Sequence, residues 1–228
     1  MKIKVCGLNN PENILSLLPL QPDYAGFIFY KKSPRYFSLP GFDNIPFGKT
    51  KKCGVFVNEN PEVVLKIINQ YALDAVQLHG EETSEYAHRI QQGGAEVIKA
   101  FSIYPAFRFE MTLPYVNSCD YFLFDTKGKN YGGNGKKFNH GYLKHYHNQK
   151  PFFLSGGIGP EDLEPVKEIQ NSGANIHGVD INSRFEISPG IKNIEIINQF
   201  INQINCQCSS AQSAGDKLRI VFPADYAD

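Results

Sequence analysis

The chain has 228 residues, which is enough for one large domain or two small ones. It carries 23 basic and 23 acidic residues, so its formal net charge is zero. This balance argues against a nucleic-acid or membrane-surface protein, because such proteins usually carry a basic patch. The N-terminus has no apolar signal-peptide core and no apolar run could span a bilayer. Five scattered cysteines are typical of a reduced protein, so we expect a cytoplasmic location.

Eight short apolar runs recur along the chain, with polar or helical segments between them. The segments Asn10-Pro11-Glu12 and Asn60-Pro61-Glu62 each predict a helix start, because they combine an N-cap residue, a proline and an acid. Further helices are expected from Thr83, from Gly159-Pro160-Glu161 and over 191–204. Segment 38–49 has room only for one distorted turn, and segment 138–147 only for a short helix. The apolar runs are residues 2–5, 24–29, 52–57, 74–78, 96–101, 120–124, 151–154 and 177–181.

This alternation of strands and helices predicts a parallel sheet. Eight such units fit a single α/β domain, a (β/α)8 barrel over residues 1–205. An open doubly wound sheet is the alternative, but it would be expected to carry a glycine-rich fingerprint where this chain has "VCGLNNPE" (5–12). Residues 206–228 form a separate tail, in which "LRIVF" (218–222) could be a short strand. The tail could be an extra element, a partner contact or non-native sequence.

The barrel prediction says where the chemistry should lie, because active sites of this fold occupy the loops after the strands. The polar and glycine residues that follow the predicted strands are Cys6, Arg35, Asn58, Gln77, His79, Ser102, Asp125, Ser155, Gly156, Gly157, Asp180, Asn182 and Ser183. They should therefore gather on one face.

Four of these residues have a functional and a structural interpretation. Cys6 could be a small buried apolar residue, but a thiol before a helix N-terminus can have its pKa lowered. Asp125 could cap a turn, or act as a charged group at the barrel mouth. Arg35 could be a surface charge, or bind a carboxylate beside aromatic rings. His79 could equally donate a structural hydrogen bond to a loop.

The segment "LSGGIGPEDL" (154–163) is more specific. Adjacent Gly156 and Gly157 let backbone N–H groups approach an anion, and the loops after strands seven and eight are the usual phosphate site of this fold. "DINS" (180–183) adds further donors. The alternative is a tight turn without a ligand. A second glycine-rich segment, "NYGGNG" (130–135), could close over a substrate or form a flexible hairpin.

Seven motifs, in order over residues 2–203, resemble those of the phosphoribosylanthranilate isomerases of tryptophan biosynthesis. They are "KVCG" (4–7), "GFIFYKKSPRY" (26–36), "GVFVN" (54–58), "DAVQLHGEE" (74–82), "LFDTKGKNYGGNGKKF" (123–138), "LSGGIGPEDL" (154–163) and "GVDINSRFEISPGIKN" (178–193). The resemblance implies an Amadori rearrangement of an aldose amine to a ketose, without a metal or an organic cofactor. It also implies a small phosphorylated substrate, no nucleic acid or membrane partner, and a monomer or homodimer.

The resemblance gives each site residue an expected role. Asp125 would be the general acid that opens the ribose ring, and Cys6 the general base that takes the C2 proton. Arg35 would hold the anthranilate carboxylate. The other residues expected to bind substrate are Gln77, His79, Gly156, Gly157, Asn182 and Ser183, with Asp180 ordering the phosphate loop.

The chain departs from the family pattern at three positions. Asn134 and Asn182 stand where the family usually has a threonine and a serine, and Arg184 where it has a glycine. Asn182 can still donate a hydrogen bond to phosphate, and Arg184 would add positive charge near that site.

Three other functions fit parts of the pattern. A histidine-pathway sugar-phosphate isomerase resembles this chain but uses a carboxylate where Cys6 stands. Indole-glycerol-phosphate synthase relies on catalytic lysines, and Lys99 is the strong barrel-facing candidate here. A barrel that only binds phosphorylated ligands would not need Cys6, Asp125 and Arg35 together.

Overall fold

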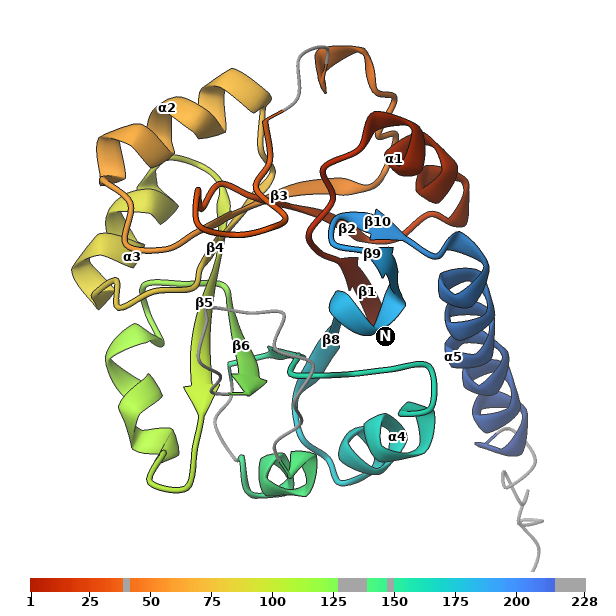
Figure 1. Cartoon of the computed structure of the whole chain (residues 1–228). Coiled ribbons are helices and arrows are strands. Elements are labelled where there is room, and N and C mark those ends of the chain that lie inside the picture. The colour runs from red at the N-terminus through yellow and green to blue at the C-terminus, as the bar shows by residue number, and fades with distance from the viewer. Residues whose placement is uncertain (39–41, 127–138, 147–149, 216–228) are drawn as a thin grey trace, which may run out of the picture.

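A computed structural model describes residues 1–38, 42–126, 139–146 and 150–215. Its eight parallel strands close into a barrel in sequence order, from β1 to β8, with the helices outside (Figure 1). This confirms the predicted (β/α)8 fold. The strands are β1 (Lys2–Val5), β2 (Tyr24–Ile28), β3 (Lys51–Phe56), β4 (Ala75–Leu78), β5 (Glu96–Ile103), β6 (Tyr121–Thr126), β7 (Phe152–Leu154) and β8 (Ile176–Ile181).

The outer layer combines α-helices with short 3₁₀ helices. Three predicted N-caps are present: Asn10 and Asn60 accept hydrogen bonds from Asn13 and Glu62 at 2.8 and 2.9 Å, and Thr83 caps α3. The helix expected from Gly159 begins later, at Leu163. The helices are α1 (Pro11–Leu17), η1 (Leu18–Leu20), η2 (Phe42–Asn44), α2 (Pro61–Tyr71), α3 (Ser84–Gln92), η3 (Phe109–Tyr115), η4 (His140–His145), α4 (Leu163–Asn171), η5 (Ser183–Phe185) and α5 (Ile194–Gly215).

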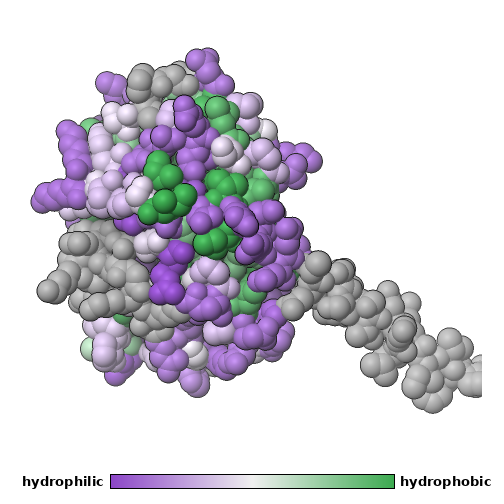
Figure 2. Space-filling model, turned by 45° about the vertical axis from the view of Figure 1, so that its right-hand side comes forward, coloured by the Kyte–Doolittle hydropathy of each residue, from purple (hydrophilic) through white to green (hydrophobic). Residues whose placement is uncertain are grey.

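The C-terminal helix α5 continues past residue 205, where the sequence pattern places the end of the barrel domain. Of residues 206–215 the structure describes the backbone only, and the segment 218–222 lies outside the described residues. None of the described helices is both long and apolar enough to cross a membrane. On the face toward α5, apolar side chains show as separate patches among hydrophilic ones (Figure 2).

The barrel wall separates two apolar cores. Side chains alternate between the faces of a strand, so every second residue points into the barrel. Those inside form a small core, and the residues between them pack outward against the helices. The inner core consists of Tyr24, Cys53, Ala75, Ile98, Ala100, Leu123 and Phe153.

A short antiparallel hairpin, which the sequence analysis did not predict, follows β8. It consists of β9 (Glu186–Ser188) and β10 (Ile191–Lys192), and it lies beside β1 and α1 (Figure 1). The Asn13 side chain of α1 accepts from the Lys192 backbone N–H at 2.7 Å and donates to its carbonyl at 2.9 Å. Helix α1 therefore fixes the hairpin at the mouth of the barrel.

The inner core yields a stability prediction. Phe153 is fully buried, and its ring lies 5.4 Å from that of Tyr24 and 5.0 Å from that of His177. Phe153→Ala should lower the free energy of unfolding by about 3–5 kcal/mol, because the barrel wall cannot collapse into the cavity. Urea unfolding would measure this, with Leu113→Ala, at a side chain 58% exposed, as the matched control. Equal losses in both variants would contradict the inner-core assignment.

Candidate active site

The first and last strands of the barrel meet beneath Cys6. Cys6 directly follows β1, is 3% exposed, and donates its backbone N–H to the Ile181 carbonyl at 2.9 Å. Lys4 lies two residues earlier and is fully buried, with its Nζ 2.8 Å from Asp180 Oδ1. The other Asp180 oxygen accepts a hydrogen bond from Ser155 at 3.2 Å. Asp180, itself in β8, therefore connects β1 to the loop after β7.

The environment of Cys6 corrects one expectation. Burial raises the pKa of the Cys6 thiol above its ordinary value, although the positive charges of Lys4 and Lys192 oppose this shift. The sequence analysis predicted a lowered pKa from the dipole of the following helix. That prediction is wrong, since α1 begins only at Pro11 and the thiol is shielded from water.

Asp125, near the end of β6, is held at both of its oxygens. Oδ1 accepts the Thr126 backbone N–H at 2.7 Å, and Oδ2 lies 3.3 Å from His79 Nε2. The Nδ1 atom of His79 in turn lies 2.8 Å from Gln77 Nε2. In this orientation the Gln77 amide nitrogen donates to Nδ1, while Nε2 lies on the side of Asp125. The Gln77 Oε1 atom is buried and accepts no hydrogen bond from a described residue.

The glycine loop after β7 packs directly against this carboxylate. Gly156 and Gly157 have φ of +90° and +72°, a backbone region that glycine adopts without strain. A Cβ atom on Gly156 would lie 2.5 Å from Thr126 Oγ1 and 3.3 Å from Asp125 Oδ1. His140, which the sequence analysis did not single out, also fixes the loop, with its Nε2 3.1 Å from the Gly156 carbonyl oxygen.

A second group of buried charged side chains lies near Cys6. Glu186 accepts the Nε of Arg35 at 2.9 Å and its Nη2 at 2.7 Å, in a two-pronged ion pair. The Lys192 Nζ lies 2.7 Å from Glu186 and 2.8 Å from Asn182 Oδ1. Burial opposes ionisation of Glu186, but the hydrogen bond from Arg35 and the charge of Lys192 outweigh it and lower the pKa of Glu186.

Gly7 connects this cluster to Cys6. Its φ is +80°, and a Cβ atom there would lie 2.7 Å from both Arg35 Cδ and Asn182 Oδ1. Ser183 follows Asn182 at the start of η5 and is half-buried. The structure therefore gathers all the site residues predicted from sequence at the carboxyl ends of the strands.

The sequence analysis missed Glu186 and Lys192. Both lie in "FEISPGIK" (185–192), within a motif that carries the family resemblance. They are cross-strand partners in the hairpin. Two charged residues in a short segment after the last strand were the available signal.

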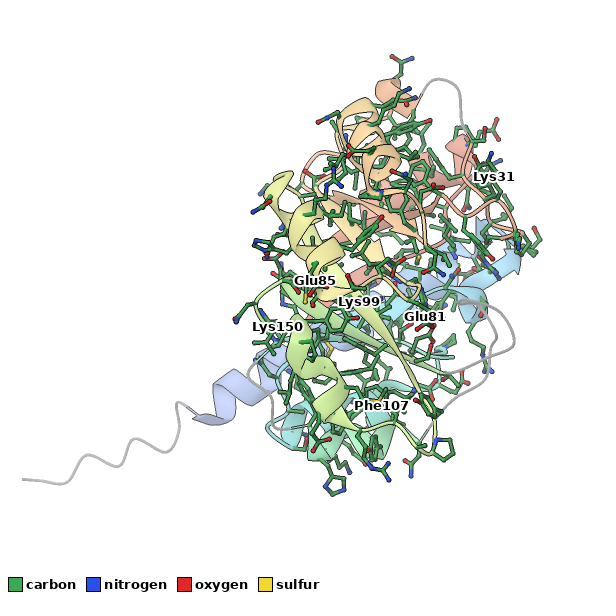
Figure 3. The ribbon with its side chains drawn as sticks, turned by 90° about the vertical axis from the view of Figure 1, so that its left-hand side faces the viewer. Lys31, Glu81, Glu85, Lys99, Phe107 and Lys150 are labelled. Carbon is green, nitrogen blue, oxygen red and sulfur yellow. The ribbon has the colours of Figure 1, made fainter. Side chains whose placement is uncertain are left out.

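Lys99 does not face the barrel interior, contrary to expectation. Its neighbours Ile98 and Ala100 lie in the inner core, so Lys99 points outward, on the side shown in Figure 3. Its Nζ pairs with Glu82 at 2.9 Å and donates to the Gly80 carbonyl at 2.7 Å.

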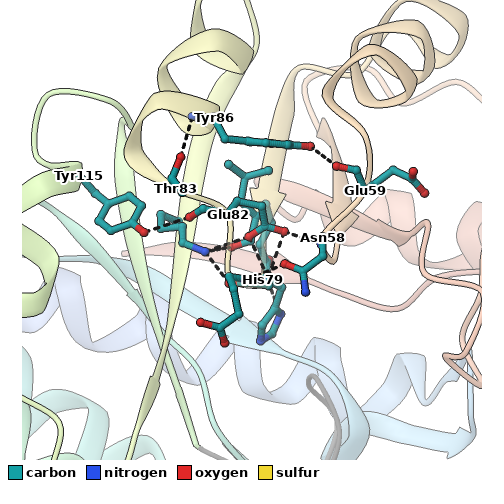
Figure 4. Close-up of polar contacts among 12 residues, drawn as sticks. Asn58, Glu59, His79, Glu82, Thr83, Tyr86 and Tyr115 are labelled. Atoms are coloured by element: carbon teal, nitrogen blue, oxygen red, sulfur yellow. Dashed lines mark hydrogen bonds and ion pairs between the residues drawn. The ribbon is translucent and has the colours of Figure 1, made fainter.

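The surrounding contacts complete this outer network. Tyr115 donates to the Glu82 carbonyl at 3.0 Å, and the Asn58 backbone N–H donates to the Glu82 carboxylate at 2.8 Å. In Figure 4 the His79 ring lies on the other side of the network from Tyr86. The network supports the β4 loop from outside and leaves Lys99 fully engaged.

Two departures from the family pattern have different outcomes. Arg184 forms an ion pair with Glu161 of the neighbouring loop, so its charge is partly neutralised rather than free for phosphate. Asn134 and the segment 130–135 lie outside the described residues. Within the described ranges there is no group of three or more side chains that could hold a metal ion.

Comparison with known proteins assigns the family. A family model described as N-(5'-phosphoribosyl)anthranilate (PRA) isomerase matches residues 3–203. The chain belongs to this family. It is therefore an isomerase with the (β/α)8 fold. The N-(5'-phosphoribosyl)anthranilate isomerase of Parabacteroides distasonis is 42% identical over 208 residues, covering 90% of this chain and 93% of the relative.

Solved structures of family members agree with this assignment. Monomers made from the dimeric phosphoribosylanthranilate isomerase of Thermotoga maritima superpose with a TM-score of 0.77 at 32% identity, covering 90% of this chain and 99% of theirs. A phosphoribosylanthranilate isomerase in complex with reduced 1-(o-carboxyphenylamino)-1-deoxyribulose 5-phosphate gives 0.76 at 31% identity, with the same coverage.

The burial of Cys6 yields a prediction about its reactivity. Because burial raises the thiol pKa, alkylation of Cys6 by iodoacetamide should accelerate at a higher pH in the folded protein than in urea. In urea the midpoint should return to about 8.5, the value of an unperturbed cysteine. Peptide mass mapping would follow Cys6 separately from the other cysteines. A folded-state midpoint below that in urea would contradict the burial argument.

Proposed function

We propose that the chain converts N-(5'-phosphoribosyl)anthranilate to 1-(2-carboxyphenylamino)-1-deoxyribulose 5-phosphate, in tryptophan biosynthesis and without a cofactor. One observation carries the proposal. A buried thiol and a buried carboxylate, Cys6 and Asp125, share the barrel mouth with two groups suited to anions, Arg35 and the Gly156 loop. This combination matches a substrate that carries an aryl carboxylate at one end and a phosphate at the other.

The first step would open the ribose ring. Asp125 donates a proton to the ring oxygen, the bond from C1 to that oxygen breaks, and the nitrogen lone pair forms an iminium ion. The Thr126 N–H and the His79 ring hold the two oxygens of the carboxyl group, so its direction is fixed before substrate arrives. His79 would therefore act as a positioning residue as well as a substrate contact, with Gln77 orienting its ring.

The second step would remove the C2 proton. The Cys6 thiolate takes this proton from the iminium ion and an enolamine forms. The enol proton then returns to Asp125 while C1 is protonated from Cys6, so both groups regain their starting states. A raised pKa leaves less thiolate in the free protein but makes the thiolate a stronger base. The positive iminium ion would favour the thiolate when it is needed.

The two anion sites would fix the substrate at both ends. Arg35 takes the carboxylate, because a guanidinium group binds carboxylates through paired N–H bonds. The backbone of the glycine loop and the start of η5 would bind the phosphate group at the other end. Holding both ends aligns the ribose with the acid and the base, which lowers the entropic cost of reaction. The residues assigned to phosphate are Gly156, Gly157, Asn182 and Ser183.

The alternatives are less well supported. Lys99 cannot serve as the catalytic lysine of a synthase, because it points out of the barrel and is bonded to Glu82 and to the Gly80 carbonyl. A histidine-pathway isomerase would need a carboxylate where Cys6 stands. We further propose a cytoplasmic enzyme that acts as a monomer or homodimer on a small phosphorylated substrate. The dimeric Thermotoga maritima relative is consistent with either state, since its monomers were also obtained.

Turnover of phosphoribosylanthranilate, followed by its loss of fluorescence, tests this function. Cys6→Ala and Asp125→Asn should each lower kcat by at least about a hundredfold, since each removes one proton-transfer group. Cys119→Ala, at another buried thiol on the outer side of the barrel, is the matched control and should retain activity. A folded protein that leaves the fluorescence unchanged would refute the proposed activity. Activity that survives both substitutions would refute the two roles.

A further inference from the structure

The ion pair between Arg35 and Glu186 uses only one side of the guanidinium group. Glu186 is bonded to Nε and Nη2, and among the described residues no hydrogen bond uses Nη1. An arginine offers carboxylates two paired edges, one through Nε and Nη2 and the other through Nη1 and Nη2. The second edge is therefore available to a ligand.

Glu186 itself is saturated. Its Oε1 accepts from Arg35, from Lys192 at 2.7 Å and from the Gly190 backbone N–H at 3.2 Å, while Oε2 accepts from Arg35 at 2.7 Å. It therefore has little capacity left to contact a substrate directly. The lowered pKa of Glu186 keeps the carboxylate ionised at neutral pH.

Arg35 and Lys192, which are 8% and 1% exposed, share the single carboxylate of Glu186. Burial lowers the pKa of Lys192, so the lasting positive charge of the cluster is the guanidinium group of Arg35. An anion bound at its open edge would add a second charged partner to this buried cation. The nearby Lys4 and Asp180 already neutralise one another.

We propose that Glu186 is the positioning residue that holds the guanidinium of Arg35 by one edge and so directs the other edge at the aryl carboxylate of the substrate. This inference rests on the proposed function. Lys192 anchors Glu186 in turn, and the hairpin carries both residues as cross-strand partners. The hairpin thereby contributes to the selection of a carboxylated over a neutral aryl amine, without touching the ligand.

Equilibrium binding of two ligands tests the proposal. One is reduced 1-(o-carboxyphenylamino)-1-deoxyribulose 5-phosphate, and the other is the same molecule without its carboxyl group. The readout is the ratio of their dissociation constants, measured by titration calorimetry. Glu186→Asp keeps the charge but shortens the side chain, so it cannot hold the edge in place. Glu186→Asp should therefore lower the preference, which is the dissociation constant of the ligand without a carboxyl group divided by that of the carboxylated ligand, about tenfold. This is the effect expected for one misaligned charge-assisted hydrogen bond. Binding of the ligand without a carboxyl group should change less than about twofold.

A double-mutant cycle isolates the effect. Arg35→Met should abolish the preference for the carboxylated ligand, and Glu186→Asp added to it should change the ratio no further. Glu195→Asp, at an exposed acid in the first turn of α5, is the matched control and should leave the ratio unchanged. If Glu186→Asp fails to fold, Glu186→Gln takes its place, since an amide has one acceptor oxygen and cannot hold both guanidinium nitrogens.

The outcomes separate the two proposals. If the folded wild type binds neither ligand, the proposed function itself fails. If the wild type prefers the carboxylated ligand but Glu186→Asp weakens both ligands equally, Glu186 only supports the fold. An unchanged ratio, or a further loss when Arg35 is already absent, also overturns the positioning role.

Discussion

The ion pair between Lys4 and Asp180 is the contact on which the rest of the site depends. The two residues are partners in the register of β1 and β8, the strands that close the barrel, and Nζ and Oδ1 are 2.8 Å apart. Burial alone would lower the pKa of Lys4, but the negative charge of Asp180 raises it and keeps the ammonium protonated. Apolar residues could close this seam with similar stability, so the pair is better explained by what lies above it.

Two residues beyond each partner lie groups to which we assign a role toward the substrate. Cys6 follows Lys4 and Asn182 follows Asp180, each on the same side of its strand because side chains alternate. Two chains of contacts start from these residues. One runs from Asp180 through Ser155 and the glycine loop to Asp125, and the other from Asn182 through Lys192 and Glu186 to Arg35. Each proposed role is thus tied to the same buried pair through two or three contacts.

The sequence was sufficient for the fold because most barrel strands are short, mainly apolar runs, and several of them are followed by a clear helix start. It was also sufficient for the location of the site, since the ends of parallel strands meet on one face. It was insufficient for properties that depend on neighbours distant in sequence. The pKa of Cys6 follows from its burial rather than from the next helix, and the direction of Lys99 depends on the register of β5. The hairpin strands are too short to show alternation, so Glu186 and Lys192 were missed.

The proposed chemistry also explains why a buried thiol suits this site better than a carboxylate. The base must act on a cation that exists only after the ring has opened. A carboxylate would be charged throughout, and its burial would require a permanent partner. A thiol with a raised pKa can stay neutral in the free protein, so it needs no such partner, and Lys4 remains paired with Asp180. The thiol proton would pass to solvent as substrate binds, and the thiolate would then take the C2 proton once the iminium ion has formed and return it to C1, so that Cys6 ends each turnover as the thiolate that began it.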